Sequence, residues 1–307
     1  MAEQYYYKKG KSLESIRKKL GFCYGLAPVK HSDSLYEAGI DMNPRTIDDV
    51  DVFINECINE GAKKVILSEI DQKTFDYIIK SIRETVEILH IKNFYNPYDD
   101  QKGTSYDLKF LALCKNLKEV HIDLYNGTLN LWELNGNQNL EELYICGCKK
   151  LVNQDGLRNC KAKTLRIVRA IGGIPDTKDL VIDDFSVFNT MENLENLDLF
   201  TGKKKDKKDD LLSLANLKNI KEIKLTKNYF TFKQFAWLSS KLPGVKGIGC
   251  IHKWEYDKRV EADTYTINGT RMAWEFKDRT GKEIEKYLRK FDKLVEEYKN
   301  QDIPPID

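Results

Sequence analysis

The stretch that decides the fold reads Leu140-Glu-Glu-Leu143-Tyr-Ile145-Cys-Gly-Cys148-Lys-Lys-Leu151. Its apolar residues follow the spacing L-x-x-L-x-L, here called a kernel, and Cys148 comes three positions after the kernel ends. A second stretch, Ile220-Lys-Glu-Ile223-Lys-Leu225-Thr-Lys-Asn228, repeats the spacing with asparagine in place of that cysteine. Successive residues of a strand point to opposite faces. The last two apolar residues of each kernel are therefore expected to face an interior, and the residue between them to face outward.

Weaker copies of the kernel recur along the chain. Their middle residues are Val65, Leu89, Val120, Leu165, Leu180, Leu197 and Ile248. With Leu143 and Ile223 included, successive middle residues are 24, 31, 23, 22, 15, 17, 26 and 25 positions apart. Six of these eight intervals lie close to the roughly 20–29 residues of a one-strand repeat. We therefore expect an α/β protein built from stacked repeats, because a single turn of chain cannot bury its apolar edge alone.

The two strongest copies resemble leucine-rich repeats. The stretch around Leu143 is similar to the cysteine-containing type, because Gln154-Asp155-Gly156-Leu157 and Cys160 follow it at the place of that type's Asp-x-Gly-Leu-like tail. The resemblance implies a leucine-rich-repeat solenoid, with a curved parallel sheet of about nine short strands and convex helices or loops. It also implies recognition of a protein partner on the concave face.

The segments between kernels predict the outer layer. Apolar residues at helical spacing predict helices from Asp71, a suitable N-cap, to Arg83 and from Thr231 to Leu242. The two short intervals beside Leu180 leave no room for a helix, so a thin wall is expected there. The charged run 203–210 is expected to be a solvated loop, with phosphate or nucleic-acid binding as the alternative.

Both ends of the chain are predicted to cap the repeats. We assign residues 1–61 to an N-terminal helical cap, 62–252 to the solenoid and 253–307 to a C-terminal hairpin and helix module. Asn43-Pro44 opens a helix that Gly61 closes, and 13–20 form a short helical stretch. A hairpin around Asn268-Gly269 precedes a helix with a capping box at Thr280 and Glu283. The apolar face of this helix covers the open end or, alternatively, docks a partner.

Composition narrows the class of protein. The 307 residues are 41% hydrophobic, and their 50 basic and 48 acidic side chains leave a formal net charge of +2. No apolar run reaches the ~18 residues of a membrane span, and the first residues lack the features of a secretory signal. Seven cysteines without zinc-site spacing are expected to be reduced thiols. These features predict a cytoplasmic protein, and nothing in them calls for a membrane or nucleic-acid partner.

The outward residues of successive kernels should form two rows, because neighbouring strands lie about 4.8 Å apart. The first row is predicted to be His90, His121, Tyr144, Arg166, Val181, Asp198, Lys224 and Gly249. The second is predicted to be Lys92, Asp123, Cys146, Val168, Asp183, Phe200, Thr226 and Ile251. Tyrosine and arginine are enriched among residues that dominate binding energy. The candidate partner-binding residues are accordingly His90, His121, Asp123, Tyr144, Arg166, Asp198, Phe200 and Lys224.

An enzyme or metal protein centred on His90 and His121 is the alternative. Asp123 and Cys146 could complete a zinc site, or Cys146 could form a nucleophilic pair with a histidine. The spacing supplies only proximity, and the sequence identifies neither supporting ligands nor an oxyanion hole. We therefore expect a protein-binding module without enzymatic activity, metal or cofactor. An inhibitory, immunity or adaptor role is an expectation by analogy of fold.

Overall fold

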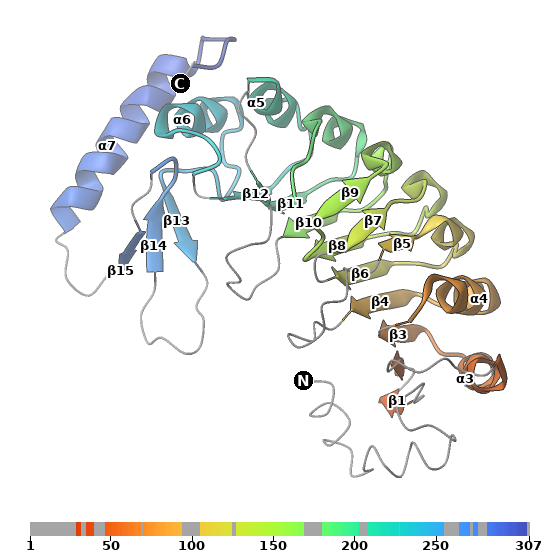
Figure 1. Ribbon diagram of the computed structural model, residues 1–307. Helices are drawn as coiled ribbons and strands as arrows, with labels where there is room; N and C mark the ends of the chain where they lie inside the picture. The colour runs from red at the N-terminus through yellow and green to blue at the C-terminus, as the bar shows by residue number, and fades with distance from the viewer. Residues whose placement is uncertain are drawn as a thin grey trace. The chain divides into compact units, whose positions relative to one another are not determined.

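The computed structural model describes residues 29–31, 35–39, 47–68, 70–93, 105–124, 127–168, 180–202, 208–226, 228–254, 264–270, 273–275 and 281–305. Two compact units make up the chain, residues 1–162 with 170–177 and residues 163–169 with 178–307. Strands alternate with helices along both units, so the protein is of the α/β class, as expected (Figure 1). The predicted helical stretch 13–20, the cap at Asn43-Pro44 and the capping residue Thr280 lie outside the described residues.

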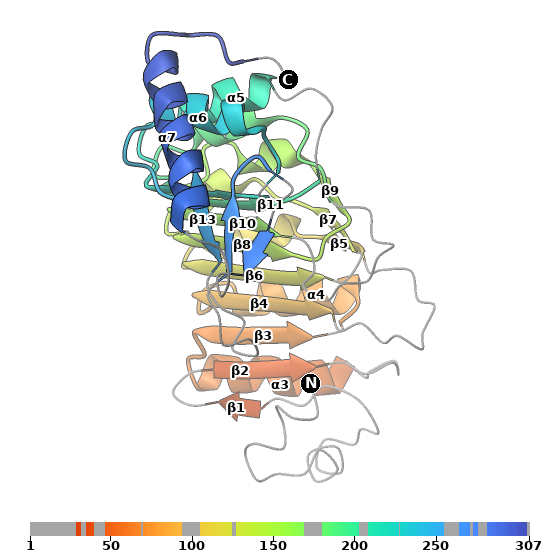
Figure 2. The same cartoon turned by 90° about the vertical axis from the view of Figure 1, so that its left-hand side faces the viewer.

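The main sheet of the first unit contains strands in the order β1-β2-β3-β4-β6-β8. Their bounds are β1 Val29–His31, β2 Leu35–Gly39, β3 Lys64–Ser68, β4 Ile88–Asn93, β6 Glu119–Leu124 and β8 Glu142–Cys146. From β2 onward each strand pairs in parallel with the next, and these strands lie as successive rungs in Figure 2. The four kernels of this unit all form strands. Their middle residues are completely buried: Val65, Leu89, Val120 and Leu143.

The second unit has a parallel sheet of β10 Thr164–Val168, β11 Asn196–Phe200 and β12 Glu222–Leu225. The kernel predicted at Leu180 is wrong, because β10 pairs directly with β11. Leu180 and Ile182 are buried outside any strand, and the Leu180 carbonyl accepts a hydrogen bond from the Gly202 amide at 2.7 Å. The two short intervals on either side of Leu180 therefore belong to one longer connection between β10 and β11.

The last predicted kernel, at Ile248, also fails to form a strand. Only Lys246 bridges to Glu222, and Gly247 then adopts a φ of +87°. A Cβ at Gly247 would lie 2.1 Å from the Ile223 carbonyl oxygen, so only glycine allows this close approach to β12. The chain continues instead into an antiparallel sheet of β13 Ile251–Trp254, β14 Thr264–Ile267 and β15 Ala273–Glu275.

The helices of the first unit begin and end as local sequence dictates. Helix α3 (Ile47–Asn59) is terminated by Gly61, whose φ is +60°. The Gly61 amide donates to the Ile58 carbonyl, and the Ala62 amide donates to the Cys57 carbonyl. This pair of hydrogen bonds is the Schellman motif that the glycine predicted. Helix α4 (Gln72–Ile82) begins after Asp71, which accepts the Thr74 amide at 2.9 Å. The apolar residues at helical spacing in this segment are completely buried: Phe75, Ile78, Ile79 and Ile82.

A second, smaller parallel sheet was not foreseen from the sequence. It consists of β5 Ser105–Asp107, β7 Thr128–Asn130 and β9 Lys150–Val152, in that order. Short 3-10 helices follow these strands: η1 Lys109–Leu113, η2 Leu134–Gly136 and η3 Gln154–Leu157. Buried Asn137 holds this layer together, since it donates to the carbonyls of Leu111 and Cys114 and accepts from the Trp132 indole at 2.6 Å.

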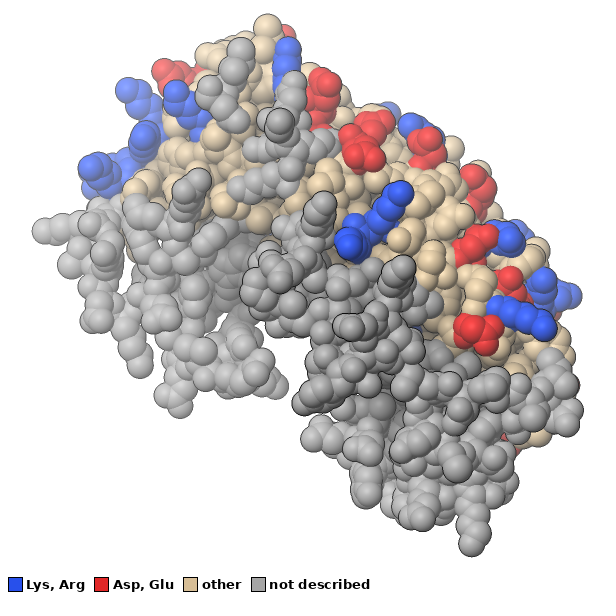
Figure 3. Space-filling view, viewed as in Figure 1, with Lys and Arg blue, Asp and Glu red and all other residues tan. Residues whose placement is uncertain are grey.

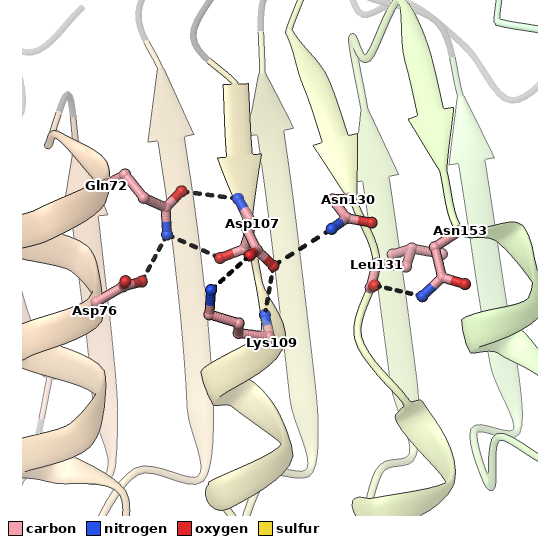
Figure 4. Close-up of polar contacts among 7 residues, drawn as sticks. All are labelled: Gln72, Asp76, Asp107, Lys109, Asn130, Leu131 and Asn153. Atoms are coloured by element: carbon pink, nitrogen blue, oxygen red, sulfur yellow. Dashed lines mark hydrogen bonds and ion pairs between the residues drawn. The ribbon is translucent and has the colours of Figure 1, made fainter.

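The Gln72 side chain closes one edge of this small sheet. Its Oε1 accepts the Asp107 amide at 2.7 Å and its Nε2 donates to the Asp107 carbonyl at 2.8 Å, as a neighbouring strand would (Figure 4). The same Nε2 donates to Asp76 at 2.6 Å. Figure 4 also shows Asn130 and Asn153 continuing the row of polar contacts across the following strands. Helix α4 is thereby joined to the edge strand β5.

The second unit carries more helix than expected. A 3-10 helix, η4 (Phe185–Thr190), lies in the segment for which the sequence predicted a thin wall, so that prediction is wrong. Helix α5 (Lys208–Ala215) takes up the end of the charged run, where Asp210 is buried and accepts the Tyr229 hydroxyl at 2.9 Å. The predicted solvated loop is therefore wrong for residues 208–210, and residues 203–207 lie outside the described chain.

The predicted helix near Thr231 is confirmed as α6 (Phe232–Lys241), with a capping box between Thr231 and Gln234. Helix α7 (Gly281–Tyr298) packs on it, with the Phe232 ring 5.4 Å from Phe291 and 6.1 Å from Tyr287. The apolar face of α7 thus contacts α6. No helix in the described residues is both long and apolar enough to cross a bilayer.

The predicted hairpin is β14–β15, but its turn differs from the expected one. The Thr270 amide donates to the Ile267 carbonyl. Of the two central residues, Asn268 and Gly269, only Gly269 has a positive φ, as in a type II turn. The buried Asn268 side chain donates to the carbonyls of Gly247 and Gly249 at 3.0 and 2.8 Å. Asn268 and Gly269 are therefore held by neighbouring backbone and do not form the tight hairpin turn predicted from their sequence.

Successive turns of both units share one pattern of backbone contacts. The residue before a strand accepts two hydrogen bonds of 2.7–3.2 Å from consecutive amides of the following turn. The accepting carbonyls belong to Lys63, Glu87 and Lys118 in the first unit and to Lys163 and Glu195 in the second. An asparagine directly before a kernel also donates to a carbonyl of the preceding turn, at Asn116, Asn139 and Asn219. The turns are thus equivalent in hydrogen bonding.

Candidate partner-binding surface

Outward-facing residues of the first unit form a grid on the face of the main sheet that the buried kernel residues do not occupy. Strand register aligns three rows across β3, β4, β6 and β8. The outer row is Lys64, Ile88, Glu119 and Glu142; the middle row is Ile66, His90, His121 and Tyr144; the third is Ser68, Lys92, Asp123 and Cys146. The predicted residues His90, His121, Asp123 and Tyr144 are therefore neighbours. The outer row with its two glutamates was not singled out from the sequence.

The middle row is aromatic over three strands. The His90 and His121 rings stack with centroids 4.4 Å apart and planes 21° apart. The Tyr144 ring lies 5.6 Å from His121 at 57°. Parallel β pairing imposes the short spacing between these side chains. The row presents a continuous aromatic surface of partly exposed rings.

Electrostatics keep His90 neutral. Burial is the main cause that lowers the pKa of His90 to about 4, and the charges of His121, Lys92 and Lys64 act in the same direction. Because imidazole in water has a pKa near 6.5, His90 carries no charge at neutral pH. It can accept or donate a hydrogen bond there but cannot serve as a cation.

The third row contains a carboxylate joined to a thiol. Loss of surrounding water raises the pKa of Asp123, while a hydrogen bond from the Cys146 thiol and the charge of Lys92 oppose that shift. More than a third of the Asp123 surface is exposed, so solvent weakens all three effects. Cys146, the last residue of this row, is itself buried.

The second unit has corresponding rows on β10, β11 and β12. Arg166, Asp198 and Lys224 align in register, and Val168 is paired with Phe200. Burial raises the pKa of Asp198 to about 6, against the opposing charges of Lys224 and Arg166. One carboxylate oxygen of Asp198 is buried and has no hydrogen-bond partner among the described residues. Unpartnered buried polar atoms are costly, which agrees with burial as the cause of the raised pKa.

Four predicted members of the rows lie elsewhere. Val181 and Asp183 belong to the irregular segment that follows Leu180 and do not lie between Arg166 and Asp198. Gly249 and Ile251 follow the turn at Gly247 and leave the parallel sheet. In both segments the apolar residues have the spacing of a strand because they are buried, although their backbone forms no strand.

The side chains around the histidines do not have the geometry of a shared metal site. The nitrogen lone pairs of the two stacked rings lie in nearly parallel planes, whereas ligands of one ion must converge on it. The described residues contain no group of three or more histidine, cysteine or acidic side chains placed to hold a metal ion. The alternative of a metal site at His90 and His121 stays a prediction. It requires one of these two side chains to change rotamer.

Five buried thiols of the described residues have raised pKa values and are protonated at neutral pH. Burial raises the pKa of Cys57, Cys114 and Cys250 to about 12 and that of Cys160 to about 11. The pKa of Cys148 is raised further, also by burial. No disulfide joins any of the six cysteines that the structure describes. A nucleophilic cysteine needs a lowered pKa, so these five are structural.

Charges on the helical side of the described surface are mixed in sign (Figure 3). Glu87 lies between Lys63 and Lys118 at 2.8 and 2.6 Å, and Lys221 contacts Glu195 at 2.7 Å. The hydrogen bond from Lys118 is the largest cause that lowers the pKa of Glu87. Such alternation differs from the one-sign field of a nucleic-acid site.

No model of a known protein family matches the chain, and a comparison with characterised proteins finds no match either.

Proposed function

We propose that the chain is a leucine-rich-repeat solenoid that binds another protein through the outward-facing rows of its parallel strands. The observation that carries the proposal is the equivalence of successive turns. Kernels at a spacing typical of such repeats have their apolar residues in the core, and within each unit most of the residues between these are at least partly exposed. A rigid sheet that displays side chains in register is suited to recognition, because little conformational entropy is lost on binding.

The chemistry of the rows supports a protein ligand. The first unit offers a stacked aromatic surface beside acidic and basic side chains. The second offers a row of alternating charge, Arg166, Asp198 and Lys224, beside Phe200. Interfaces are enriched in aromatic residues and arginine, with charges at the rim. An inhibitory, immunity or adaptor role in the cytoplasm is the biological setting that we propose for this binding.

Affinity capture from the native cell tests the proposal. Tyr144→Ala with Arg166→Ala removes one large side chain from the rows of each unit. We expect capture of the partner to fall at least tenfold, since hot-spot truncations cost about 2 kcal/mol or more each. The matched control is Tyr77→Ala with Arg158→Ala, which removes the same residue types from α4 and from the turn after η3.

The two double variants must behave differently for the proposal to stand. Both need native circular dichroism and an unchanged unfolding midpoint to within a few degrees before capture is compared. Equal capture by the wild-type chain and the Tyr144/Arg166 variant would overturn binding through the rows. Loss of capture in the Tyr77/Arg158 control alone would relocate the interface to the helical side.

A further inference from the structure

After α7 the chain turns back towards α6, and residues 299–305, here called the strap, are held there by their backbone (Figure 2). Three side chains of α6 donate to carbonyl oxygens of the strap: Gln234 to Pro305 at 3.3 Å, Trp237 to Gln301 at 2.9 Å and Lys241 to Lys299 at 3.1 Å. The donors follow one another at helical spacing, so they share one face of α6. The strap therefore runs along α6 in the direction opposite to the helix.

The side chains of the strap contribute little to its attachment. Asp302 and Ile303 are exposed, and Ile303 is 68% exposed although it is apolar. Asp302 lies 3.9 Å from Lys241, but its own side chain is fully in solvent, where ion pairs are weak. Pro304 is buried and Pro305 is partly buried. The strap is thus held by its backbone carbonyls and by its prolines, and not by the rest of its sequence.

Donors aimed at backbone carbonyls beside prolines are suited to binding an extended peptide. A proline fixes its own φ and favours an extended conformation in the residue before it. A segment such as Ile303-Pro304-Pro305 therefore loses little conformational entropy when it is bound. Proteins that recognise proline-containing segments use aromatic surfaces for this purpose. Trp237 combines a large ring with an N–H that reaches a carbonyl of the strap, and so offers both kinds of contact.

We propose that α6 carries a binding site for an extended, proline-containing segment of a partner protein, and that the strap occupies this site as an internal competitor. The site uses residues of α6 and is a second surface, distinct from the outward-facing rows of the parallel strands. The strap follows α7, which packs on α6, so its effective concentration at the site is on the order of millimolar. A partner segment binds only by displacing the strap, and the intact chain is therefore autoinhibited at this site.

A full chain with a weakened strap tests the inference. Pro304→Gly with Pro305→Gly keeps the backbone carbonyls of the strap, but it removes the buried ring and loosens the unbound segment. The probe is a fluorescein-labelled peptide with the sequence of residues 299–305, and its binding is followed by anisotropy. We expect saturable binding to this opened chain and at least tenfold weaker binding to the wild-type chain, whose own strap competes. A probe with both prolines replaced by glycine should bind the opened chain at least tenfold more weakly.

Variants of α6 in the opened chain locate the probe. Trp237→Phe keeps an aromatic ring but removes the N–H, and it should weaken binding about fivefold, as loss of one hydrogen bond predicts. Trp132→Phe is the matched control, because that indole donates to Asn137 and not to the strap, and it should have no effect. Lys241→Met removes a second donor at a partly exposed position, so it gives an independent test with less risk to folding, and it should also weaken binding about fivefold.

Several results would overturn the inference. If the opened chain loses native circular dichroism, or keeps it and does not bind the probe, the strap is a fixed part of the fold and no peptide site exists beneath it. Equal binding of the glycine-substituted probe, or equal effects of Trp237→Phe and Trp132→Phe, would place the probe elsewhere. Concentration-dependent dimers of the wild-type chain in light scattering would show that a second copy's strap is the occupant. Adding Tyr144→Ala and Arg166→Ala to the opened chain should leave probe binding unchanged, because the two surfaces are distinct.

Discussion

At the scale of single residues, His90 links stability to pH. Its pKa is about 4 in the folded chain because of burial and nearby positive charge, and near 6.5 when unfolded. Between these values the unfolded state binds a proton that the folded state refuses, so stability falls as pH falls from 6.5 towards 4. The loss amounts to about 1–3 kcal/mol. His90→Phe keeps a ring in the stack but cannot titrate, so the variant should lose less stability than the wild-type chain over this range.

Urea unfolding at pH 7 and pH 4.5 measures the difference. Asp198, whose raised pKa of about 6 contributes stability that is lost as pH rises, is common to both chains and cancels in the comparison. Tyr144→Phe is the matched control, because it alters the same row without a group that titrates in this range. An equal drop in wild type and His90→Phe would show that His90 titrates normally.

Residue-level features of the site were predictable only in part. Kernel spacing places His90, His121 and Tyr144 in one row, because parallel strands with the same apolar register must align the residues between. It does not determine rotamers, so the stacking of two rings and the isolation of His121 Nε2 could not be foreseen. Nor could the sequence place Asp198 directly beside Arg166, since a false strand at Leu180 separated them.

At the scale of elements, Gln72 protects a sheet edge. Its amide satisfies both the N–H and the C=O of Asp107 on β5, and exposed edges invite pairing with other chains. Gln72→Ala should lower the free energy of unfolding by about 1–3 kcal/mol, because two partly buried backbone groups lose their partner. Gln72→Glu keeps the acceptor but places a charge beside Asp76 and Asp107, so it should be more destabilising at pH 7 than at pH 4.

Chemical denaturation of both variants checks this, with light scattering to detect association through β5. Gln138→Ala is the matched control, since that glutamine is exposed and bonds only a carbonyl of its own turn. If Gln72→Ala is as stable as Gln138→Ala, the amide does not act as an edge cap.

The sequence predicts the helices and strands whose apolar residues recur with a clear period, and it does not predict those that lack such a period. Helix α4 has both an N-cap and an apolar stripe, so its bounds followed from the sequence. Strands β5, β7 and β9 have three residues each, too few for alternation to show. Leu180 and Ile182 have the spacing of a strand because both are buried, although their backbone is irregular. Burial sets the pattern, and backbone pairing decides which buried segments become strands.

At the scale of the whole molecule, the proposed solenoid predicts that stability is distributed turn by turn. In stacked repeats each turn contacts mainly its neighbours, so a cavity weakens the nearby turns most. Leu143 in β8 and Leu225 in β12 are core residues of different compact units. Replacing either with alanine should cost about 2–5 kcal/mol of local stability.

Hydrogen exchange followed by mass spectrometry distinguishes local from global loss. Leu143→Ala should accelerate exchange in residues 105–160 and leave α6 and α7 protected, and Leu225→Ala should give the reverse pattern. Both leucines occupy kernel positions, so each variant is the control for the other. Uniform acceleration of every segment in both variants would mean that the chain unfolds as one cooperative body, which nearest-neighbour stacking of repeats does not allow.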